Sequence, residues 1–191
     1  TLPYDTAYGG GGGCLPDQTW NYNKTKLGNN GTEMVGSGGS GGGNEGLAMV
    51  KQGHCGGNEN NLNAGGGGGA GAPGTSDANG YDNPAHSCNG GIGIDLSMYF
   101  GKNLGDEGWF AGGGGGSIHY DQFSGECCDS TSRGGKGGGG DAGRNRTKRG
   151  QDGLPNSGGG GGGGSNTSAA QGGHGGSGIV IIKYYSDKKC H

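Results

Sequence analysis

Runs of glycine constrain this chain more than any other feature of its sequence. Glycine makes up 58 of the 191 residues, against roughly 7% in ordinary globular proteins. Each glycine costs about 0.5–1 kcal/mol more than alanine to order in a helix or strand. An ordered fold must therefore recover this cost from backbone contacts or cross-links. The pure runs are residues 9–13, 65–69, 112–116, 137–140 and 158–164, and a mixed Gly/Ser run covers 36–43.

Apolar side chains are too scarce for a conventional hydrophobic core. Leu, Ile, Val and Phe together account for 20 residues, well below the fraction found in ordinary globular domains. This composition argues against an ordinary enzyme domain. The net charge of −3 provides no basic footprint for nucleic acid or for an anionic membrane. The longest apolar run is residues 179–182, far short of the ~20 residues of a spanning helix, so we predict no membrane insertion.

The glycine runs predict a bundle of polyglycine II helices. Glycine is unfavourable in α-helix interiors and gives a pleated sheet no side chain to pack. The polyproline II conformation has three residues per turn and no internal hydrogen bonds, so its N–H and C=O groups need neighbours. Parallel or antiparallel glycine helices satisfy these groups laterally, and only glycine lets the backbones approach closely enough. Collagen is excluded because there is no strict G-X-Y period and proline is only 5 of 191 residues.

The spacing of the runs favours a woven single domain over residues 1–191, either whole or cut from a longer chain. Glycine runs start at residues 9, 65, 112 and 158, and longer polar or aromatic segments lie between them. A flexible linker is the alternative interpretation, but linkers rarely carry six cysteines, two tryptophans and eight tyrosines. The fold class we expect is mostly irregular, a polyglycine II bundle with disulfide staples.

A few short strands and little or no α-helix are expected beside the bundle. Residues 92–100 alternate partly, 178–185 are β-branched and aromatic, and 46–51 form a weaker candidate. Six aromatic residues can cap the ends of the bundle with apolar surface or make local loop clusters. They are Trp20, Tyr99, Phe100, Trp109, Phe110 and Tyr120.

The cysteines favour an oxidising compartment. A chain poor in apolar residues needs disulfide cross-links to stabilise its fold, and six cysteines can pair in 15 ways. Zinc binding is the rival, because adjacent ligand residues occur at His54-Cys55, Cys127-Cys128 and Cys190-His191. No C-x2-C or H-x3-5-H spacing supports a zinc site. The disulfide candidates are Cys14, Cys55, Cys88, Cys127, Cys128 and Cys190.

Four Asn-x-Ser/Thr sequons lie in polar, loop-like stretches and predict N-glycosylation. Together with the cysteines they favour a secreted glycoprotein, hence an extracellular location, or a virion surface in the alternative below. The acceptor residues are Asn23, Asn30, Asn145 and Asn166. The third lies within the one basic cluster, residues 144–149, which we interpret as a solvated loop tip or, alternatively, as a contact for an acidic glycan.

No residue pattern predicts catalysis, a cofactor or a bound metal. None of the glycine runs precedes a helical pattern or ends in Gly-Lys-Ser/Thr, as nucleotide binding requires. None of the five histidines has a nucleophile or carboxylate at a spacing typical of a catalytic site. The acidic pair at residues 106–107 is compatible with calcium but lacks the EF-hand pattern. We therefore predict a protein that is not an enzyme.

Three stretches carry a resemblance to known families: residues 65–71, residues 101–116 with GKNLGDEGWFA before a glycine run, and residues 172–184 with GGSGIVIIKY. The last resembles the closing strand of glycine-rich domains in phage tail-fibre adhesins. The wider pattern, over roughly residues 65–190, is similar to the extracellular glycine-rich domain of anaplastic lymphoma kinase and leukocyte tyrosine kinase. Both resemblances imply glycine helices in a polyproline II bundle.

The expected function is that of an extracellular structural building block for a fibre, filament, appendage or surface coat. Its partners would be other copies of itself or neighbouring subunits, with a glycan as a further possibility. The segment expected to pair with another copy contains Ile179, Val180, Ile181 and Ile182. The alternative is an adhesin tip or receptor ectodomain that recognises a glycan or protein. Gathering of residues 81–111 and 117–133 at one end of the bundle would favour the alternative.

Overall fold

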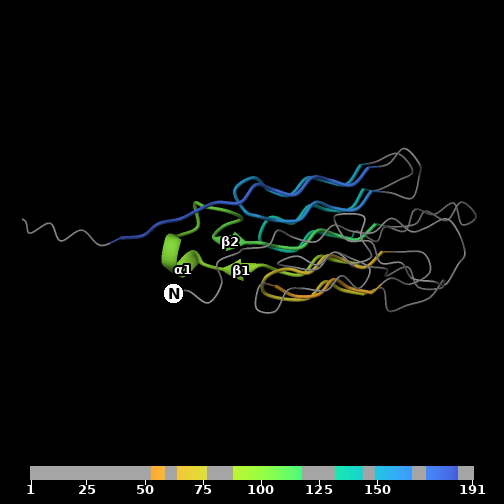
Figure 1. The fold of residues 1–191 in the computed structure, drawn as a ribbon, viewed down its shortest axis with the longest axis horizontal. Coiled ribbons are helices and arrows are strands. Elements are labelled where there is room, and N and C mark those ends of the chain that lie inside the picture. Colours follow the sequence, from red (N-terminus) through yellow and green to blue (C-terminus); the bar gives the residue numbers. More distant parts are fainter. Residues whose placement is uncertain are drawn as a thin grey trace, which may run out of the picture.

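The computed structural model describes residues 53–58, 64–76, 88–117, 132–143, 149–164 and 171–184. Most of these form long extended segments that run side by side, as Figure 1 shows. Four of the predicted glycine runs lie in these segments. The runs at residues 9–13 and 36–43 and the strand predicted at 46–51 lie outside the described residues.

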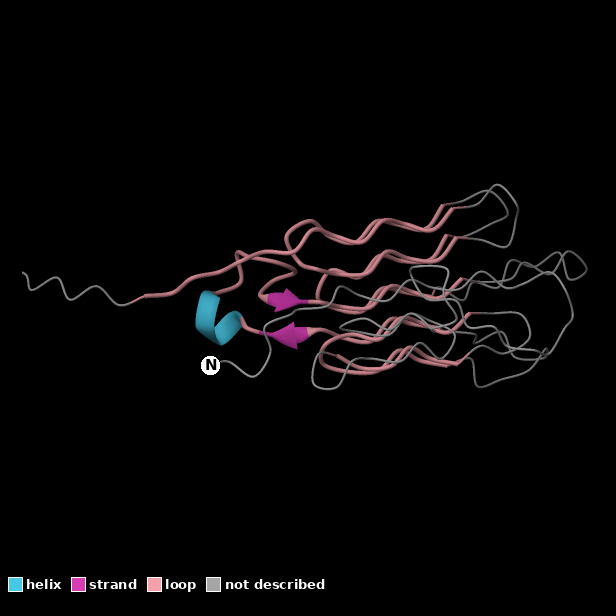
Figure 2. Cartoon of the chain, viewed as in Figure 1, coloured by secondary structure: helices cyan, strands magenta, loops and turns pink. Residues whose placement is uncertain are grey.

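Regular secondary structure is confined to one short stretch. It consists of strand β1 (Ile94–Asp95), helix α1 (Ser97–Phe100) and strand β2 (Trp109–Phe110). The two strands pair antiparallel, with Ile94 opposite Phe110 and Asp95 opposite Trp109. The rest of the described chain is mostly irregular (Figure 2). The prediction of a few short strands and little helix is confirmed for the described residues.

The strand predicted over residues 92–100 is wrong over most of its length. Only β1 is a strand, and the chain then turns into α1. The Ser97 N–H donates to Asp95 Oδ1 at 2.8 Å, which bends the backbone directly after β1. The Tyr99 and Phe100 N–H groups then donate to the Leu96 carbonyl at 3.0 and 3.1 Å. A local Asx turn therefore overrides the β propensity of this stretch.

The strand predicted over residues 178–185 also differs from the structure. Residues 178–184 are described and are not assigned to a strand. They leave the bundle beside α1 as an extended segment (Figure 1). A strand needs a neighbouring backbone to bond, and the described chain places none beside this segment. We call residues 178–184 the apolar arm.

The hydrogen bonds between the extended segments repeat every three residues. The clearest case is residues 111–117, which we call the central segment. Its carbonyls at every third position accept from a single neighbour, residues 64–70: Ala70 N–H to Ala111 O at 2.9 Å, Gly67 N–H to Gly114 O at 2.9 Å, and Ala64 N–H to Ser117 O at 3.0 Å. A period of three is the repeat of the polyproline II helix.

The same central segment bonds in several other directions. It runs antiparallel to residues 64–70 and parallel to residues 158–164. The parallel contact is made by Gly160 N–H to Gly112 O at 2.9 Å and Gly163 N–H to Gly115 O at 2.8 Å. Further bonds reach residues 88–91 and 137–140. The bonds therefore surround the segment, whereas those of a β-strand lie in one plane.

Glycine is sterically required in this interior. A Cβ atom built on Gly113, Gly114 or Gly116 would lie closer than 3.0 Å to a backbone carbonyl of a neighbouring segment. Real Cβ atoms essentially never come so close. The neighbouring backbones therefore approach one another only because these positions lack a side chain, as predicted.

The interior is built from backbone with few side chains. Among the described residues the buried hydrophobic ones are Cys88, Phe110 and Ala142. Two buried serines are satisfied by hydrogen bonds: Ser132 Oγ accepts from Cys88 N–H at 3.2 Å, and Ser157 Oγ donates to Leu154 O at 2.6 Å. Paired polar groups cost little to bury, so lateral hydrogen bonds take the place of a hydrophobic core. No helix within the described ranges has the length and apolar character needed to cross a membrane.

Candidate assembly surface at one end of the bundle

The chain leaves the hydrogen-bonded bundle of extended segments at residues 94–110, which we call the end insertion. It contains β1, α1 and β2 and lies at one end of the extended segments (Figure 1). Positive φ values at Gly101, Gly105 and Gly108 let the chain reverse within this short distance. The insertion is therefore compact, and it returns the chain to the central segment.

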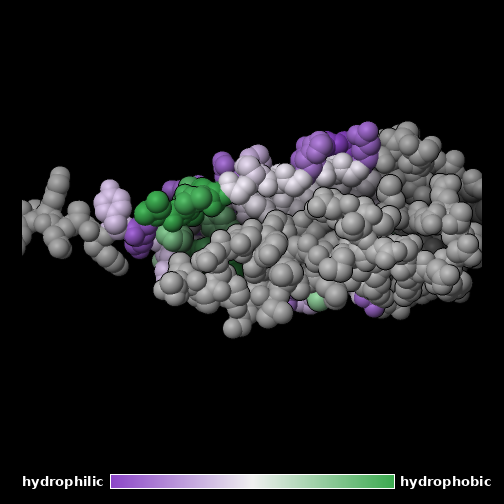
Figure 3. All heavy atoms as spheres, in the orientation of Figure 1, coloured by the Kyte–Doolittle hydropathy of each residue, from purple (hydrophilic) through white to green (hydrophobic). Residues whose placement is uncertain are grey.

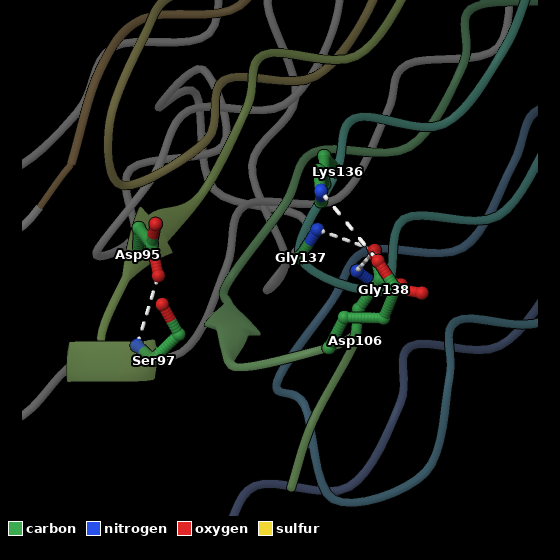
Figure 4. Close-up of polar contacts among 7 residues, drawn as sticks. Asp95, Ser97, Asp106, Lys136, Gly137 and Gly138 are labelled. Carbon is green, nitrogen blue, oxygen red and sulfur yellow. Dashed lines mark hydrogen bonds and ion pairs between the residues drawn. The ribbon is translucent and has the colours of Figure 1, made fainter. Parts of the chain in front are cut away.

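Asp106 ties the end insertion to the bundle. Its Oδ2 accepts from the N–H groups of Gly137 at 2.8 Å and Gly138 at 3.3 Å, as Figure 4 shows. These glycines form a turn with φ of 108° and 88°, so their N–H groups converge on one point, as in an anion nest. A carboxylate from a distant part of the chain thus caps this turn.

The side chains around Asp106 strengthen the same junction. Lys136 Nζ lies 3.8 Å from Glu107 Oε2 and 5.1 Å from the centre of the Trp109 ring. The ion pair is exposed, and such pairs contribute little; the cation–π contact adds a second tie between the turn and the insertion. Trp109 and Asp106 also exchange backbone hydrogen bonds at 3.0 Å.

Four of the six aromatic residues singled out in the sequence lie in the end insertion. Phe110 is buried, Trp109 is half-buried, and the ring centres of Tyr99 and Phe100 are 6.4 Å apart. Tyr99 nevertheless remains 65% exposed. Trp20 and Tyr120 lie outside the described residues. The one ring contact among the described aromatics, between the chain neighbours Tyr99 and Phe100, is a local cluster, and capping of the bundle stays a prediction.

The apolar arm exposes its hydrophobic side chains in an alternating pattern. Val180, Ile182 and Tyr184 are 87%, 80% and 80% exposed, whereas Ile179 is 38% exposed and Ile181 is half-buried. Alternation is the period of an extended chain. The hydrogen bond from Lys183 Nζ to Tyr99 O at 3.2 Å places the second row against the end insertion. The outward row is therefore apolar.

Most exposed large hydrophobic residues of the described chain belong to these two regions. Figure 3 shows apolar side chains gathered where the arm leaves the bundle. In the insertion and the residue pair before it, the exposed members are Ile92, Ile94, Met98 and Tyr99; in the arm they are Ile179, Val180, Ile182 and Tyr184. Contiguous apolar surface of this kind is typical of interaction sites.

Asp95 keeps a negative charge beside this surface. Hydrogen bonds from the side chain and the N–H of Ser97 lower the pKa of Asp95, and the positive charges of Lys136 and Lys102 act in the same direction. The carboxylate is therefore ionised at neutral pH. The pattern Asp-x-Ser at residues 95–97 is typical of Asx turns and was a signal for this feature in the sequence.

Two of the six candidate cysteines are described. Cys55 is exposed with a free thiol, and Cys88 is buried. The described residues contain no disulfide between them, so the disulfide staples remain a prediction. Cys14, Cys127, Cys128 and Cys190 lie outside the described residues, as do the sequon residues Asn23, Asn30, Asn145 and Asn166.

The other chemistry-bearing residues make local contacts. Of the basic cluster, Arg149 is described, and its Nη2 pairs with Asp152 Oδ1 at 2.7 Å. The His174 N–H donates to the same oxygen at 2.6 Å. Within the described ranges, no group of three or more His, Cys, Asp or Glu side chains is arranged to hold a metal ion.

Comparison with known families places these observations in context. A family profile described as a glycine-rich domain matches residues 4–185. The chain belongs to this glycine-rich domain family. Comparison with curated proteins and with solved structures finds no match. Family membership agrees with the glycine content of the sequence, and it assigns no partner to the apolar surface.

Proposed function

We propose that this glycine-rich domain is a polyglycine II bundle that serves as a non-enzymatic structural building block of an extracellular fibre, appendage or coat. The observation that carries the proposal is the lattice of backbone hydrogen bonds around the central segment, with its repeat of three. A lattice of this kind is a stiff element with little side-chain bulk. Its interior is filled by backbone, which suits a mechanical role better than a chemical one.

The resemblances to the phage tail-fibre and receptor-kinase domains support the same bundle. In those families glycine helices form the scaffold, and the residues that carry the likeness here include the central segment and residues 172–184. The sequons and the cysteines support the extracellular location that we propose. Disulfides between those cysteines would add stability by constraining the unfolded chain.

Amide hydrogen exchange tests the bundle directly. In a folded lattice, the N–H groups of Gly113, Gly115 and Gly116 are bonded to neighbouring segments, so they should exchange slowly in the purified protein. Fast exchange at all three would overturn the bundle and the function built on it. Electron microscopy of the secreted, non-reduced protein tests assembly, and mass spectrometry of its glycopeptides tests glycosylation at the four sequons.

A recognition tip is the second candidate, because the described part of residues 81–111 that leaves the lattice lies at one end. Exposed Tyr99 and half-buried Trp109 there have rings on which a sugar or a protein ligand can stack. Of residues 117–133, most lie outside the described ranges. A glycan array probed with the native protein and with Tyr99→Ala discriminates the two functions. Binding that is lost in the variant favours the tip.

A further inference from the structure

One row of exposed glycines has no reason to be glycine within the described chain. Six described glycines are exposed. Two of them, Gly101 and Gly158, have positive φ, and a Cβ on Gly71 would clash with a neighbouring carbonyl. A Cβ on any of the other three would lie 3.5 Å or more from its nearest neighbour, in space that a side chain can occupy. These three recur at every third position: Gly172, Gly175 and Gly178.

The backbone of the same row lacks hydrogen-bond partners. Residues 171–177, which we call the edge segment, lie at the margin of the bundle (blue in Figure 1). Gly172, Gly175 and Gly178 neither donate nor accept a hydrogen bond within the described chain. Their N–H and C=O groups are therefore unpaired over two turns, or about 19 Å, of an extended helix. Like the open edge of a β-sheet, such a row can be completed by another backbone.

The contacts of the edge segment within the molecule show how one backbone meets the next. The segment donates to residues 159–162 through the N–H groups of Gly173 and Gly176, at 2.7 and 2.8 Å. It accepts from the N–H groups of Gly150 and Gly153, at 2.9 and 2.8 Å. Among the described residues, neither contact includes a backbone-to-backbone bond in the reverse direction. Each neighbour therefore either donates or accepts, and the unpaired row can make one contact of each kind.

The same row of another molecule fits both kinds of contact. The unpaired N–H groups need a row of acceptors, and the unpaired carbonyls need a row of donors. No other glycine row of the described chain is both exposed and without hydrogen bonds. The edge segment contains no Asp, Glu, Lys or Arg, so two copies can meet there without repulsion between like charges. The segment thus carries both halves of the contact that holds the bundle together.

We infer that the edge segments of successive copies pair side by side, with the unpaired N–H row of one copy donating to the unpaired carbonyl row of the next. This inference rests on the proposed building-block function and specifies the surface through which the blocks join. Each contact uses a donor row on one copy and an acceptor row on the other, so one row on each copy stays available and the contact repeats. The product is an open-ended filament, whereas a closed twofold dimer would need bonds in both directions.

Sedimentation velocity of the 191-residue chain over a range of concentrations tests this inference. A contact of three hydrogen bonds is small, so the association should be weak and reversed by dilution. We expect the weight-average mass to rise continuously with concentration. The amides of Gly172 and Gly175 should exchange fast in dilute protein and slowly in assembled protein. A monomer at all concentrations, or growth that stops at a dimer, would overturn the inference.

Gly175→Ala makes the test specific, because it should act in opposite directions on the monomer and on the assembly. The monomer tolerates the added methyl group, since a Cβ at this position meets its nearest atom at 3.6 Å. A paired backbone as close as those inside the bundle would clash with it, so each contact should weaken roughly tenfold or more. Gly172→Ala should do the same. Gln151→Ala, at an exposed position of the neighbouring segment, is the matched control and should leave assembly unchanged.

The variants also identify the other possible occupants of the row. Assembly that is insensitive to both Gly175→Ala and Gly172→Ala would use another surface, which rejects the inference. Destabilisation of dilute, monomeric Gly175→Ala would mean that a glycine run of the same chain, such as residues 9–13, covers the row, and this also contradicts the inference.

The outcome is separable from that of the proposed function. Amide exchange of the central segment is measured on the same variants, because a folded bundle is a condition of the comparison. Slow exchange there without growth, or with growth through another face, rejects the edge contact and retains the bundle. Fast exchange throughout rejects both.

Discussion

The central segment and the edge segment, residues 171–177, use glycine for different reasons. In the centre, neighbours surround the backbone, and a Cβ at Gly113, Gly114 or Gly116 would clash with a carbonyl. At the edge, Gly173 and Gly176 face inward under the same constraint. A Cβ at Gly172 or Gly175, by contrast, would meet its nearest atom at 3.5 or 3.6 Å, an ordinary contact. The requirement for glycine therefore depends on how many backbones surround a position.

Residues 149–154 are hydrogen-bonded to the edge segment and place their glycines differently. In residues 149–154, Gly150 and Gly153 are buried at a spacing of three, and every exposed position carries a side chain. The edge segment instead keeps glycine at exposed positions 172 and 175. Glycine thus recurs at every third position facing the neighbouring backbones in both segments, buried at Gly150 and Gly153 and half-buried at Gly173 and Gly176. Exposed glycine distinguishes the edge segment.

The largest expected effect comes from filling the centre. Gly114→Ala should destabilise the fold by about 1–3 kcal/mol, since the added methyl group clashes with the Gly161 carbonyl and neither backbone can yield without breaking lateral bonds. Urea unfolding monitored by circular dichroism measures the change. An unaltered midpoint in Gly114→Ala would show that the central backbones are farther apart than described.

Removing the cap of the turn should have an effect of comparable size. Asp106→Ala leaves the N–H groups of Gly137 and Gly138 without their carboxylate, at a cost of roughly 1.5–3 kcal/mol. Its matched control is Glu107→Ala, which removes an exposed ion pair and should cost about 0–1 kcal/mol. Equal losses in the two variants would contradict the role assigned to Asp106. The same unfolding assay applies.

A smaller effect of opposite sign is expected at the edge. Gly175→Ala meets only ordinary contacts and restricts the unfolded chain, so it should stabilise the protein by about 0.4–1 kcal/mol. Chemical unfolding of Gly175→Ala beside Gly114→Ala sharpens the contrast between edge and centre. Destabilisation by Gly175→Ala would mean that this face is covered in solution.

The smallest effect is a local pH dependence at the edge. The His174 N–H and, secondarily, the Arg149 side chain lower the pKa of Asp152. Because the folded pKa lies below the unfolded one, the contribution of this carboxylate is present above about pH 4 and is lost as pH falls through the lowered pKa. NMR should show the His174 amide resonance shifting in that range, with the central segment unchanged and Asp152→Asn abolishing the shift.

The sequence predicted the principle of the fold but not its connections. Five consecutive glycines at residues 112–116 indicated backbone packing in place of a core, and the described hydrogen bonds have the expected period of three. Which runs are neighbours was not predictable, because identical glycines carry no information about their partners. The cap by Asp106 was missed for the same reason: its turn lies 31 residues away, and no local pattern marks it.

The strand predictions were wrong for a different reason. The β-branched composition of residues 178–185 predicted a strand, and the described residues 178–184 have the extended backbone but no partner. Composition reports what a backbone prefers, whereas a strand also needs a second backbone beside it. At residues 94–100, an Asp95–Ser97 hydrogen bond marks the point where the chain turns from strand into helix.

By itself, the sequence determined that this protein is built from closely packed glycine backbone, because too few apolar side chains exist to build it in another way. The tertiary structure decided which end of the bundle carries the aromatic insertion and the apolar arm. That choice depends on where the chain leaves and rejoins the lattice, and it is made by hydrogen bonds between residues far apart in sequence.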